Sequence, residues 1–581
     1  MIKRLLPFMK GYRKEAILAP ILVSLETVCE LILPLLMAGI IDDGIGQSNL
    51  PVTFRLGAAM LVVAGVSMCC GIFSARYAAL AAQGLGANLR KAEFDKISSF
   101  SFADIDRFSS ASLITRMTND VTNIQMVVAI CLRMLVRSVV MMVMAMGVAL
   151  WINAGLAVWV IVILPVVAAV LLLLMHICNP LFQTMQRKID ALNQTIQENL
   201  VAARVVKAFV RQDFEKEKFR AANDAYTKAG LAAVLRVVLM SPVLMMGVST
   251  ATVLILYNGG LIVLQGGMEI GELSSLLNYI FNILFSVMMV GMALLQYTRA
   301  EACAKRIFEV LDAVPDIQSG QDIGQRGERA LRGQVEFRDV SFKYRSSGTG
   351  DNVLHGITFT AKPGQVVAIV GGTGVGKSTL VNLIPRFYDV TGGEVLVDGV
   401  NVRDYSLDIL RNKVGMVLQK NVLFSGTIRE NLLWGDEHAT EEELIQAAKD
   451  AQAYDFIMSF PKGFDTYLEQ GGVNVSGGQK QRLCIARAML RKPSVLILDD
   501  STSAVDSATE ALIRQSFHEN LKGTTVILIA QRISSVMGAD QIIVLDDGTV
   551  AGIGTHDELM AGNRIYQEIY WSQQEGVSEN G

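Results

Sequence analysis

Six long apolar stretches limit the fold of this chain more than any other feature. A helix needs about 20 apolar residues to cross the hydrocarbon core of a bilayer. Only Ile152 to Ala154 separate the third stretch from the fourth, which predicts a tight hairpin. We therefore expect a membrane domain of six transmembrane helices. They are expected at residues 16–41, 56–80, 128–152, 155–177, 236–264 and 273–296.

The bulk composition favours a membrane protein and excludes several other classes. At 581 residues the chain is too long for one hydrophobic core, so at least two domains are expected. Hydrophobic residues make up 51% of the chain and charged residues only 18%. The net charge of −3 indicates no nucleic-acid partner. The seven cysteines include no Cys-x-x-Cys pair, so neither a disulfide framework nor a zinc site is expected.

The distribution of Lys and Arg predicts the orientation in the membrane. Both residue types are frequent in the long loops 81–127 and 178–235, whereas the short connections 42–54, 152–154 and 265–272 contain neither. The positive-inside rule therefore places both long loops and both termini in the cytoplasm. We expect a multi-pass protein of a prokaryotic cytoplasmic membrane.

The first 14 residues mix basic and apolar side chains, as the start of a signal peptide also does. However, the apolar run that follows is too long for a signal peptide and has no clear small-residue cleavage site. We expect an amphipathic helix on the cytoplasmic face of the membrane.

The two long loops are expected to be helical. In the second loop, apolar residues recur at every third or fourth position from Ile189 to Val210. Two helical limbs made from about 50 residues would reach roughly 35 Å beyond the membrane and could touch a cytoplasmic domain. We place the loop tips at 106–110, around Phe108, and at 209–214, beginning with Phe209. The alternative, that these tips are only solvated helical turns, stays open.

The composition changes near residue 312. Residues 315–332 are rich in Gly, Asp, Gln and Arg, which is typical of a linker. Beyond them, short β-rich segments alternate with helical ones, as in a parallel sheet covered by helices. The last residues, from about 572, are interpreted as a polar frayed tail. The expected domains are a transmembrane domain at 1–314, a linker at 315–333 and an α/β domain at 334–581.

One motif in the α/β domain fits Gly-x-x-x-x-Gly-Lys-[Ser/Thr] at every fixed position. It follows an apolar strand expected at 366–370 and precedes a helix expected to begin at Ser378. The glycines let backbone N–H groups surround phosphate oxygens, and the helix N-terminus adds a positive dipole end. Lys377 would reach the outer phosphates and Ser378 would ligate Mg²⁺. We therefore expect a nucleoside triphosphate as ligand. The expected binding residues are Gly371, Gly372, Thr373, Gly374, Val375, Gly376, Lys377, Ser378 and Thr379.

Further motifs identify a family. A hydrophobic strand expected at 494–498 ends in Asp499, the position from which P-loop proteins hold Mg²⁺. Three more motifs accompany this strand: Ser476-Gly477-Gly478-Gln479, Gln419 after an apolar run, and Ser503-Ala504-Val505-Asp506. Together these motifs closely resemble the ATP-binding-cassette (ABC) family. Six spans followed by one such domain resemble an ABC exporter half-transporter, and the resemblance covers nearly the whole chain.

The resemblance implies roles within the nucleotide site. Tyr344 matches the aromatic residue that stacks on adenine, although a tyrosine packed in the core is the alternative. Gln419 matches the residue that ligates Mg²⁺ and senses the membrane domain. Ser378 and Asp499 match the other metal ligands.

The resemblance also implies partners. Family members act as dimers, in which each ATP lies between the P-loop of one chain and the signature of the other. The signature is matched here by Ser476 to Gln479, and the D-loop by Ser503 and Asp506. Phe108 and Phe209 match the coupling helices that connect the ATP sites to the transmembrane path.

Two positions depart from the family pattern. Where the family has a Glu that polarises the attacking water, this chain has Asp500, and where it has a His that contacts the γ-phosphate, this chain has Gln531. The carboxylate of Asp lies about 1.5 Å further back, and a misplacement near 1 Å can cost on the order of 100-fold in rate. Gln cannot become cationic as His can. Both changes together indicate a pocket that binds ATP and hydrolyses it poorly.

The signature, in contrast, is intact, which leads to a specific hypothesis. The chain is expected to be the degenerate-site subunit of a heterodimeric exporter of hydrophobic or amphipathic compounds, with its signature completing a competent site on a partner half-transporter. The alternatives are a homodimeric lipid or drug flippase with two slow sites, and an ATP-gated channel or regulatory subunit.

Two carboxylates lie within the first apolar stretch. Glu26 and Glu30 are four residues apart, on one face of a helix, and Arg133 and Arg137 share this spacing in the third stretch. Charged groups inside a membrane usually face a cavity or each other. The carboxylates either line a path for cationic substrates or pair structurally with the arginines.

Overall fold

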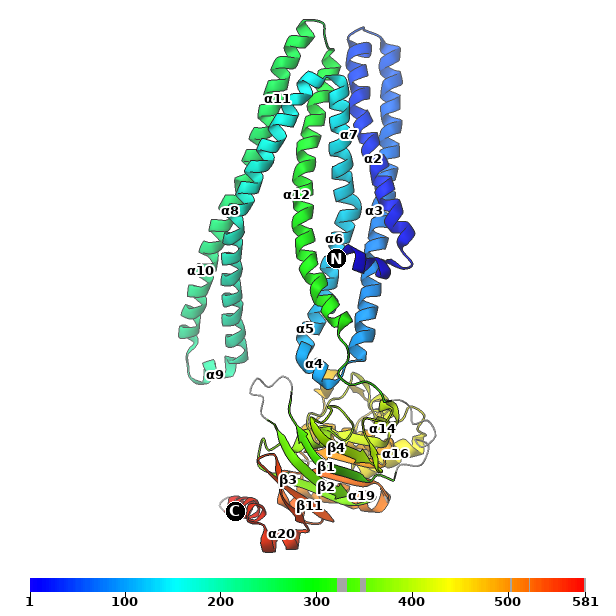
Figure 1. Ribbon diagram of the computed structural model, residues 1–581, viewed down its shortest axis with the longest axis vertical. Coiled ribbons are helices and arrows are strands. Elements are labelled where there is room, and N and C mark those ends of the chain that lie inside the picture. Colours follow the sequence, from blue (N-terminus) through cyan, green and yellow to red (C-terminus); the bar gives the residue numbers. More distant parts are fainter. Residues whose placement is uncertain (321–331, 345–351, 502–503, 522, 579–581) are drawn as a thin grey trace. The chain divides into compact units, whose positions relative to one another are not determined.

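The computed structural model describes residues 1–320, 332–344, 352–501, 504–521 and 523–578, and the chain forms two compact units. The first, helical unit comprises Met1–Lys96 and Ile114–Asp312. The second unit comprises Ile97–Leu113 and the chain from Ala313 onward. Residues 97–113, which were expected to belong to the membrane domain, therefore group with the second unit. Figure 1 labels the elements of both units.

The helical unit consists of long helices joined by short connections. Asn153 explains the tight hairpin predicted between the third and fourth apolar stretches, because its side chain caps the next helix by accepting a hydrogen bond from Leu156 N–H at 3.1 Å. The helices are α1 Ile2–Leu5, α2 Arg13–Gly39, α3 Leu50–Ser98, α5 Ser110–Thr115, α6 Val121–Ile130, α7 Val136–Ile152, α8 Ala154–Val201, α9 Ala203–Ala208, α10 Gln212–Val238, α11 Met240–Leu264 and α12 Ile270–Asp312.

Among the described residues, five helices are long and apolar enough to cross a membrane. They contain four of the six predicted stretches in full and, in Met245–Leu264, the larger part of a fifth. The remaining stretch, at 155–177, lies within α8. The stretch predicted at 236–264 is interrupted at Leu239, where α10 ends and α11 begins. Pro242 lies in the first turn of α11, where a missing N–H costs little.

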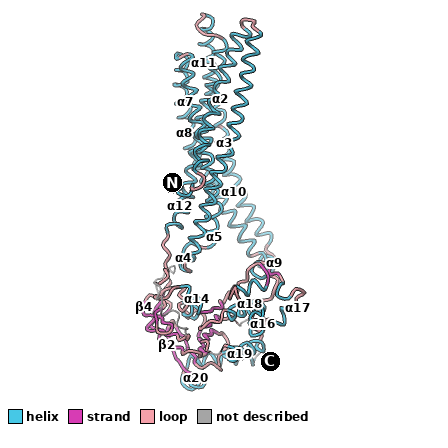
Figure 2. The backbone as a smooth tube through the Cα atoms, turned by 90° about the vertical axis from the view of Figure 1, so that its right-hand side faces the viewer, coloured by secondary structure: helices cyan, strands magenta, loops and turns pink. Residues whose placement is uncertain are grey.

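The second unit contains all the strands of the described chain, which are drawn in magenta in Figure 2. A six-stranded sheet has the order β12-β11-β3-β10-β9-β6, and a four-stranded antiparallel sheet has the order β2-β1-β4-β5. A small two-stranded sheet pairs β7 with β8. The strands are β1 Val335–Phe342, β2 Leu354–Ala361, β3 Val366–Gly371, β4 Gly392–Val397, β5 Val400–Asn401, β6 Val414–Val417, β7 Gly426–Thr427, β8 Tyr467–Leu468, β9 Val495–Asp499, β10 Thr525–Ile529, β11 Gln541–Asp546 and β12 Thr549–Gly554.

The helices of the second unit cover these sheets. They are α4 Phe102–Phe108, α13 Lys377–Asn382, α14 Leu407–Lys413, α15 Ile428–Leu433, α16 Glu441–Asp450, α17 Tyr454–Ser459, α18 Gly477–Leu490, α19 Ser507–Asn520, α20 His556–Gly562 and α21 Arg564–Ser578. The predicted fold class, a helical membrane domain and an α/β domain, is confirmed.

The central strand β3 is a continuous apolar run because both of its faces pack on a hydrophobic core. Its side chains alternate between two cores, with Ala368 and Val370 in one and Val367 and Ile369 in the other. The strand pairs in parallel with both β10 and β11. Because β9 also pairs in parallel with β10, the carboxyl ends of β3, β9 and β10 meet at one edge of the sheet.

Candidate nucleotide site

The phosphate-binding loop connects β3 to α13 at this edge of the sheet. Gly374 and Gly376 have φ angles of 86° and 94°, in the left-handed region that favours glycine. At Gly371 a Cβ atom would lie 2.3 Å from the carbonyl oxygen of Leu545. The loop therefore needs glycine at these three positions to keep its shape.

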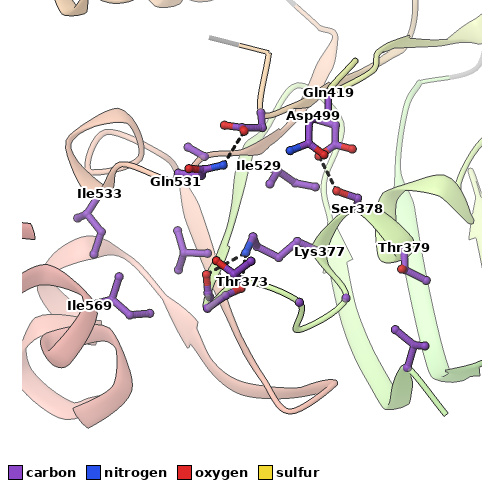
Figure 3. A pocket seen from close by; sticks show the side chains of 18 of the residues that line it. Thr373, Lys377, Ser378, Thr379, Gln419, Asp499, Ile529, Gln531, Ile533 and Ile569 are labelled. Atoms are coloured by element: carbon purple, nitrogen blue, oxygen red, sulfur yellow. Dashed lines mark hydrogen bonds between the residues drawn. The ribbon is translucent and has the colours of Figure 1, made fainter. Parts of the chain in front are cut away.

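The side chain of Lys377 hydrogen-bonds to the backbone of the phosphate-binding loop. Its Nζ donates hydrogen bonds to the carbonyl oxygens of Gly371 at 2.9 Å and Gly372 at 2.6 Å (Figure 3). Burial lowers the pKa of Lys377, while the nearby carboxylates of Asp500 and Asp499 act in the opposite direction. An anion entering the loop would favour the charged form of this lysine.

Two oxygen donors lie beside the loop. The hydroxyl of Ser378 donates to Oδ1 of Asp499 at 2.9 Å, as Figure 3 shows. Burial raises the pKa of Asp499, and the bond from Ser378 lowers it. Both side chains, with Gln419 in the same cleft, are the hard oxygen ligands that suit Mg²⁺. The described residues hold no group of three His, Cys, Asp or Glu side chains that could hold a metal ion.

The two residues that depart from the family pattern contact each other. Nε2 of Gln531 donates to Oδ2 of Asp500 at 2.6 Å. Asp500 is 9% exposed and has a φ angle of 47°, with its N–H bonded to the carbonyl of Ile529 at 3.1 Å. Burial raises the pKa of Asp500, and hydrogen bonds with Gln419 and Gln531 lower it. Amide side chains thus hold this carboxylate at the end of β9.

Tyr344 lies at the same cleft and is packed from several sides. Its hydroxyl is 3.0 Å from Oγ1 of Thr379. Its ring packs edge-on against Phe342, with centroids 4.9 Å apart, and against Tyr388 at 5.2 Å. Burial raises the pKa of the Tyr344 phenol. The side chain is therefore oriented before any ligand binds.

A cleft of about 660 Å³ joins these groups. Its lining includes the phosphate-binding loop, Tyr344, Gln419, both aspartates and Gln531. It also includes Ile569, Ser572 and Gln573 of α21, which sequence analysis did not assign to the site. The interpretation of the chain from residue 572 as a frayed tail was wrong, because α21 extends to Ser578. The recurrence of Ile565, Tyr566, Ile569 and Tyr570 at helical spacing is the signal that could have predicted it.

The signature residues form a helix start. Ser476 caps α18 through a capping box: its hydroxyl accepts from Gln479 N–H at 3.3 Å, and Oε1 of Gln479 accepts from Ser476 N–H at 2.9 Å. A Cβ atom at Gly478 would lie 2.8 Å from the carbonyl oxygen of Ala504, so the next loop packs closely there. The described lining of the cleft includes no residue from 476–479.

The expected D-loop is described in part. Asp506 caps α19 by accepting a hydrogen bond from Thr509 N–H at 2.9 Å. That bond and a second from the Thr509 hydroxyl lower the pKa of Asp506. Ser503 lies outside the described residues.

The first expected coupling segment is the helix α4, which forms part of the second unit. The ring of Phe102 packs against Phe387 with centroids 4.5 Å apart, and Oδ2 of Asp106 accepts a hydrogen bond from the Tyr388 hydroxyl at 2.9 Å. Phe108, which was placed at the loop tip, is 9% exposed and stacks on Phe100 at 5.5 Å.

The boundaries of α4 follow from its cap. Ser101 and Asp104 form a capping box, with Asp104 Oδ2 accepting from Ser101 N–H at 2.9 Å. This Ser-x-x-Asp pattern is visible in the sequence and could have predicted the helix start. The other expected coupling residue, Phe209, follows α9 and is 74% exposed.

In the helical unit, Arg137 bridges the two carboxylates of the first stretch. Its guanidinium lies 3.2 Å from Oε1 of Glu26 and 2.8 Å from Oε2 of Glu30. Glu26 is 6% exposed. Of the two interpretations of these glutamates, the geometry supports the structural pairing, with Arg137 as the cation.

The sequence matches two protein families in succession. Residues 16–288 match the ABC transporter transmembrane region, and residues 354–503 match the ABC transporter family model. The chain is 38% identical to the uncharacterized ABC transporter ATP-binding protein YfiB of Bacillus subtilis (strain 168), over 98% of each chain. It is 38% identical, over 98% of each chain, to the uncharacterized ABC transporter ATP-binding protein Rv1273c of Mycobacterium tuberculosis. The putative multidrug export ATP-binding/permease protein YgaD of Bacillus subtilis is 31% identical over 99% of each chain.

The fold and the site define a P-loop nucleotide-binding domain joined in one polypeptide to a helical membrane domain. The chain belongs to the ABC transporter family. With fused membrane and ATP-binding domains, it is an ABC exporter half-transporter and integral to the membrane. Its ABC domain implies binding of ATP, generally with Mg²⁺, and transport ATPase activity, and half-transporters of this type generally dimerise.

Proposed function

We propose that this chain is the degenerate-site subunit of a heterodimeric exporter that moves hydrophobic or amphipathic compounds, drug-like or lipid, out across a prokaryotic cytoplasmic membrane. Both termini would lie in the cytoplasm. The domains would be the transmembrane domain 1–314, the linker 315–333 and the nucleotide-binding domain 334–581. The relative YgaD is a putative multidrug export ATP-binding/permease protein, which supports this class of cargo.

The observation that carries the proposal is the hydrogen bond between Gln531 and Asp500. A general base must come within about 3 Å of the water that it activates. Asp500 has a short side chain, and its carboxylate is held by an amide that cannot take up a proton. A triphosphate bound here would be retained and seldom cleaved.

The intact signature supports a role for the chain in a second site. The box formed by Ser476 and Gln479 fixes the N-terminus of α18, a helix of 14 residues whose first N–H groups suit phosphate oxygens. Since these residues do not line the described cleft of their own chain, we assign them to an ATP bound by a partner subunit. Hydrolysis at that partner-side site would drive the transport cycle.

ATPase measurements on the purified full-length chain, alone and with its partner subunit, test the proposal. We expect the chain alone to hydrolyse Mg²⁺-ATP at least about 100-fold more slowly than the pair. In the pair, Ser476→Ala is expected to abolish most turnover, whereas Lys377→Ala lowers it less than about tenfold. Rapid turnover by the chain alone would overturn the proposal. Slow turnover coupled to lipid or drug movement without a partner would instead support a homodimeric flippase.

A further inference from the structure

The helix α21 holds the segment that carries Gln531. Nε2 of Gln573 donates to the carbonyl oxygen of Gln531 at 2.8 Å, and Oε1 of the same side chain accepts from Ile533 N–H at 2.8 Å. The two bonds fix the backbone on both sides of Arg532. A primary amide can donate and accept at once, so this pattern also fixes the orientation of the Gln573 amide.

The helix that presents Gln573 is itself anchored to the core. Asn563 accepts from Tyr566 N–H at 2.9 Å at the helix start and donates to the carbonyl of Ala551 in β12 at 3.0 Å. Tyr566 is fully buried, and its hydroxyl lies 2.8 Å from Nδ1 of His556. Ile569, one turn before Gln573, lines the cleft (Figure 3). One face of α21 therefore packs on the core and on the nucleotide cleft.

The segment that Gln573 fixes lines the same cleft as the phosphate-binding loop. The P-loop lysine, Lys377, is the residue that reaches the β- and γ-phosphates. The side chain of Gln531 is bonded to Asp500, and both residues line this cleft together with Lys377. We therefore expect a third phosphate beside Gln531, in a place that a diphosphate would leave empty.

We propose that Gln573 is a positioning residue of the nucleotide site, which holds Gln531 where its amide meets both Asp500 and the terminal phosphate of ATP. The proposal rests on the proposed function only in requiring that this cleft binds Mg²⁺-ATP. It implies that the C-terminal helix, through one side chain, sets the preference of the site for a triphosphate over a diphosphate. Loss of the two bonds would release the Gln531 segment without altering the phosphate-binding loop.

Equilibrium binding of a non-hydrolysable ATP analogue and of ADP, both with Mg²⁺, to the full-length chain tests this inference. Gln573→Met keeps the side-chain length but removes both hydrogen bonds. It is expected to weaken binding of the analogue about tenfold and binding of ADP less than twofold. Gln574→Met is the matched control, because Gln574 is exposed and its amide lies 3.5 Å from the Tyr570 hydroxyl; it should change neither affinity.

Equal weakening of both nucleotides, or no weakening, would show that Gln573 has only a structural role or none and would overturn the inference. Gln573→Glu is a second variant, which keeps the acceptor for Ile533 N–H and loses the donor to Gln531. It should show the same selective loss, and wild-type affinity for the analogue would again overturn the inference. Rapid ATP hydrolysis by the unmodified chain would refute the heterodimer proposal. It would not refute this inference, because the binding measurements use an analogue that is not cleaved.

Discussion

Nε2 of Gln531 lies 2.6 Å from Oδ2 of Asp500, so the two departures from the family pattern form one hydrogen-bonded unit. Two substitutions that share a bond are not expected to act independently. A longer carboxylate at position 500 would still be held by the amide, and an imidazole at position 531 would still face a short carboxylate.

We therefore predict non-additive recovery of ATP hydrolysis in the chain alone. Asp500→Glu and Gln531→His are each expected to raise the rate less than about threefold, whereas the double variant raises it about 100-fold, the scale of a correctly placed general base. The measurement is steady-state phosphate release. Asp540→Glu is a control for the added methylene, because Asp540 binds Val366 N–H at 2.8 Å and does not line the described cleft. Full recovery with either single variant would show that the two positions are uncoupled.

The local geometry of the loop after β3 follows from the sequence for a physical reason. A phosphate-binding loop is contiguous in the chain, and its glycines are required by backbone angles and close approaches at Gly371, Gly374 and Gly376. Asp499 could be predicted because the carboxyl ends of parallel strands meet at one edge of the sheet.

The parts that could not be predicted depend on contacts between distant segments. Gln573 acts on Gln531 across 42 residues of sequence, and a polar residue near the chain end carries no sign of such a bond. In the same way, the packing of Phe102 on Phe387, far away in the sequence, shows which face of α4 packs on the rest of the second unit. The sequence did not predict that α10 ends and α11 begins at Leu239, because apolar residues continue on both sides of this position.

The contact between α4 and Tyr388, which packs against Tyr344 of the cleft, leads to a second prediction. Tyr388 donates to Asp106 of α4, and its ring packs edge-on against Tyr344. Tyr388→Phe removes the bond to α4 and keeps the ring. Stimulation of ATPase activity by a hydrophobic cationic dye is expected to fall several-fold in the heterodimer, while ATP affinity changes less than twofold.

Tyr405→Phe is the matched control for this experiment, because the Tyr405 hydroxyl donates to the carbonyl of Val397 at 2.9 Å, within the second unit. It should leave dye stimulation unchanged. Unchanged stimulation in Tyr388→Phe would show that this hydrogen bond does not transmit the signal from α4.

The Arg137 bridge in the helical unit leads to a third prediction. Arg137→Gln leaves Glu26 and Glu30 close together without their cation. We expect a loss of about 2 kcal/mol in the free energy of unfolding, below the ~3–5 kcal/mol of a fully buried pair because the Arg137 side chain is 40% exposed. Thermal unfolding of the full-length chain in detergent measures the loss.

The triple variant Glu26→Gln, Glu30→Gln, Arg137→Gln removes all three charges and should recover most of this stability. Equal stability of Arg137→Gln and the unmodified chain would contradict the interpretation that the two glutamates pair structurally with Arg137. The glutamates would then be tested as a path for cationic substrates, by measuring transport in the Glu26→Gln, Glu30→Gln variant.

The fourth prediction concerns pH. Burial raises the pKa of Asp500 above its ordinary value of 3.8. A carboxyl whose pKa is higher in the folded than in the unfolded state contributes stability that is fully present below the unfolded pKa and is lost as the pH rises through the folded pKa. At pH 7.5, ionised Asp500 therefore lowers the stability of the nucleotide-free protein.

Asp500→Asn removes this ionisation and keeps an acceptor for Gln531. We expect its unfolding midpoint to exceed that of the unmodified chain by about 2 °C at pH 7.5, and the difference to shrink as the pH is lowered. Asp506→Asn should behave oppositely, because hydrogen bonds from Thr509 lower the pKa of Asp506, so its stabilising contribution is present at neutral pH and is lost in acid. A midpoint of Asp500→Asn below that of the unmodified chain at pH 7.5 would show that ionised Asp500 stabilises the empty site, since the bonds from Gln419 and Gln531 would then outweigh the cost of its burial.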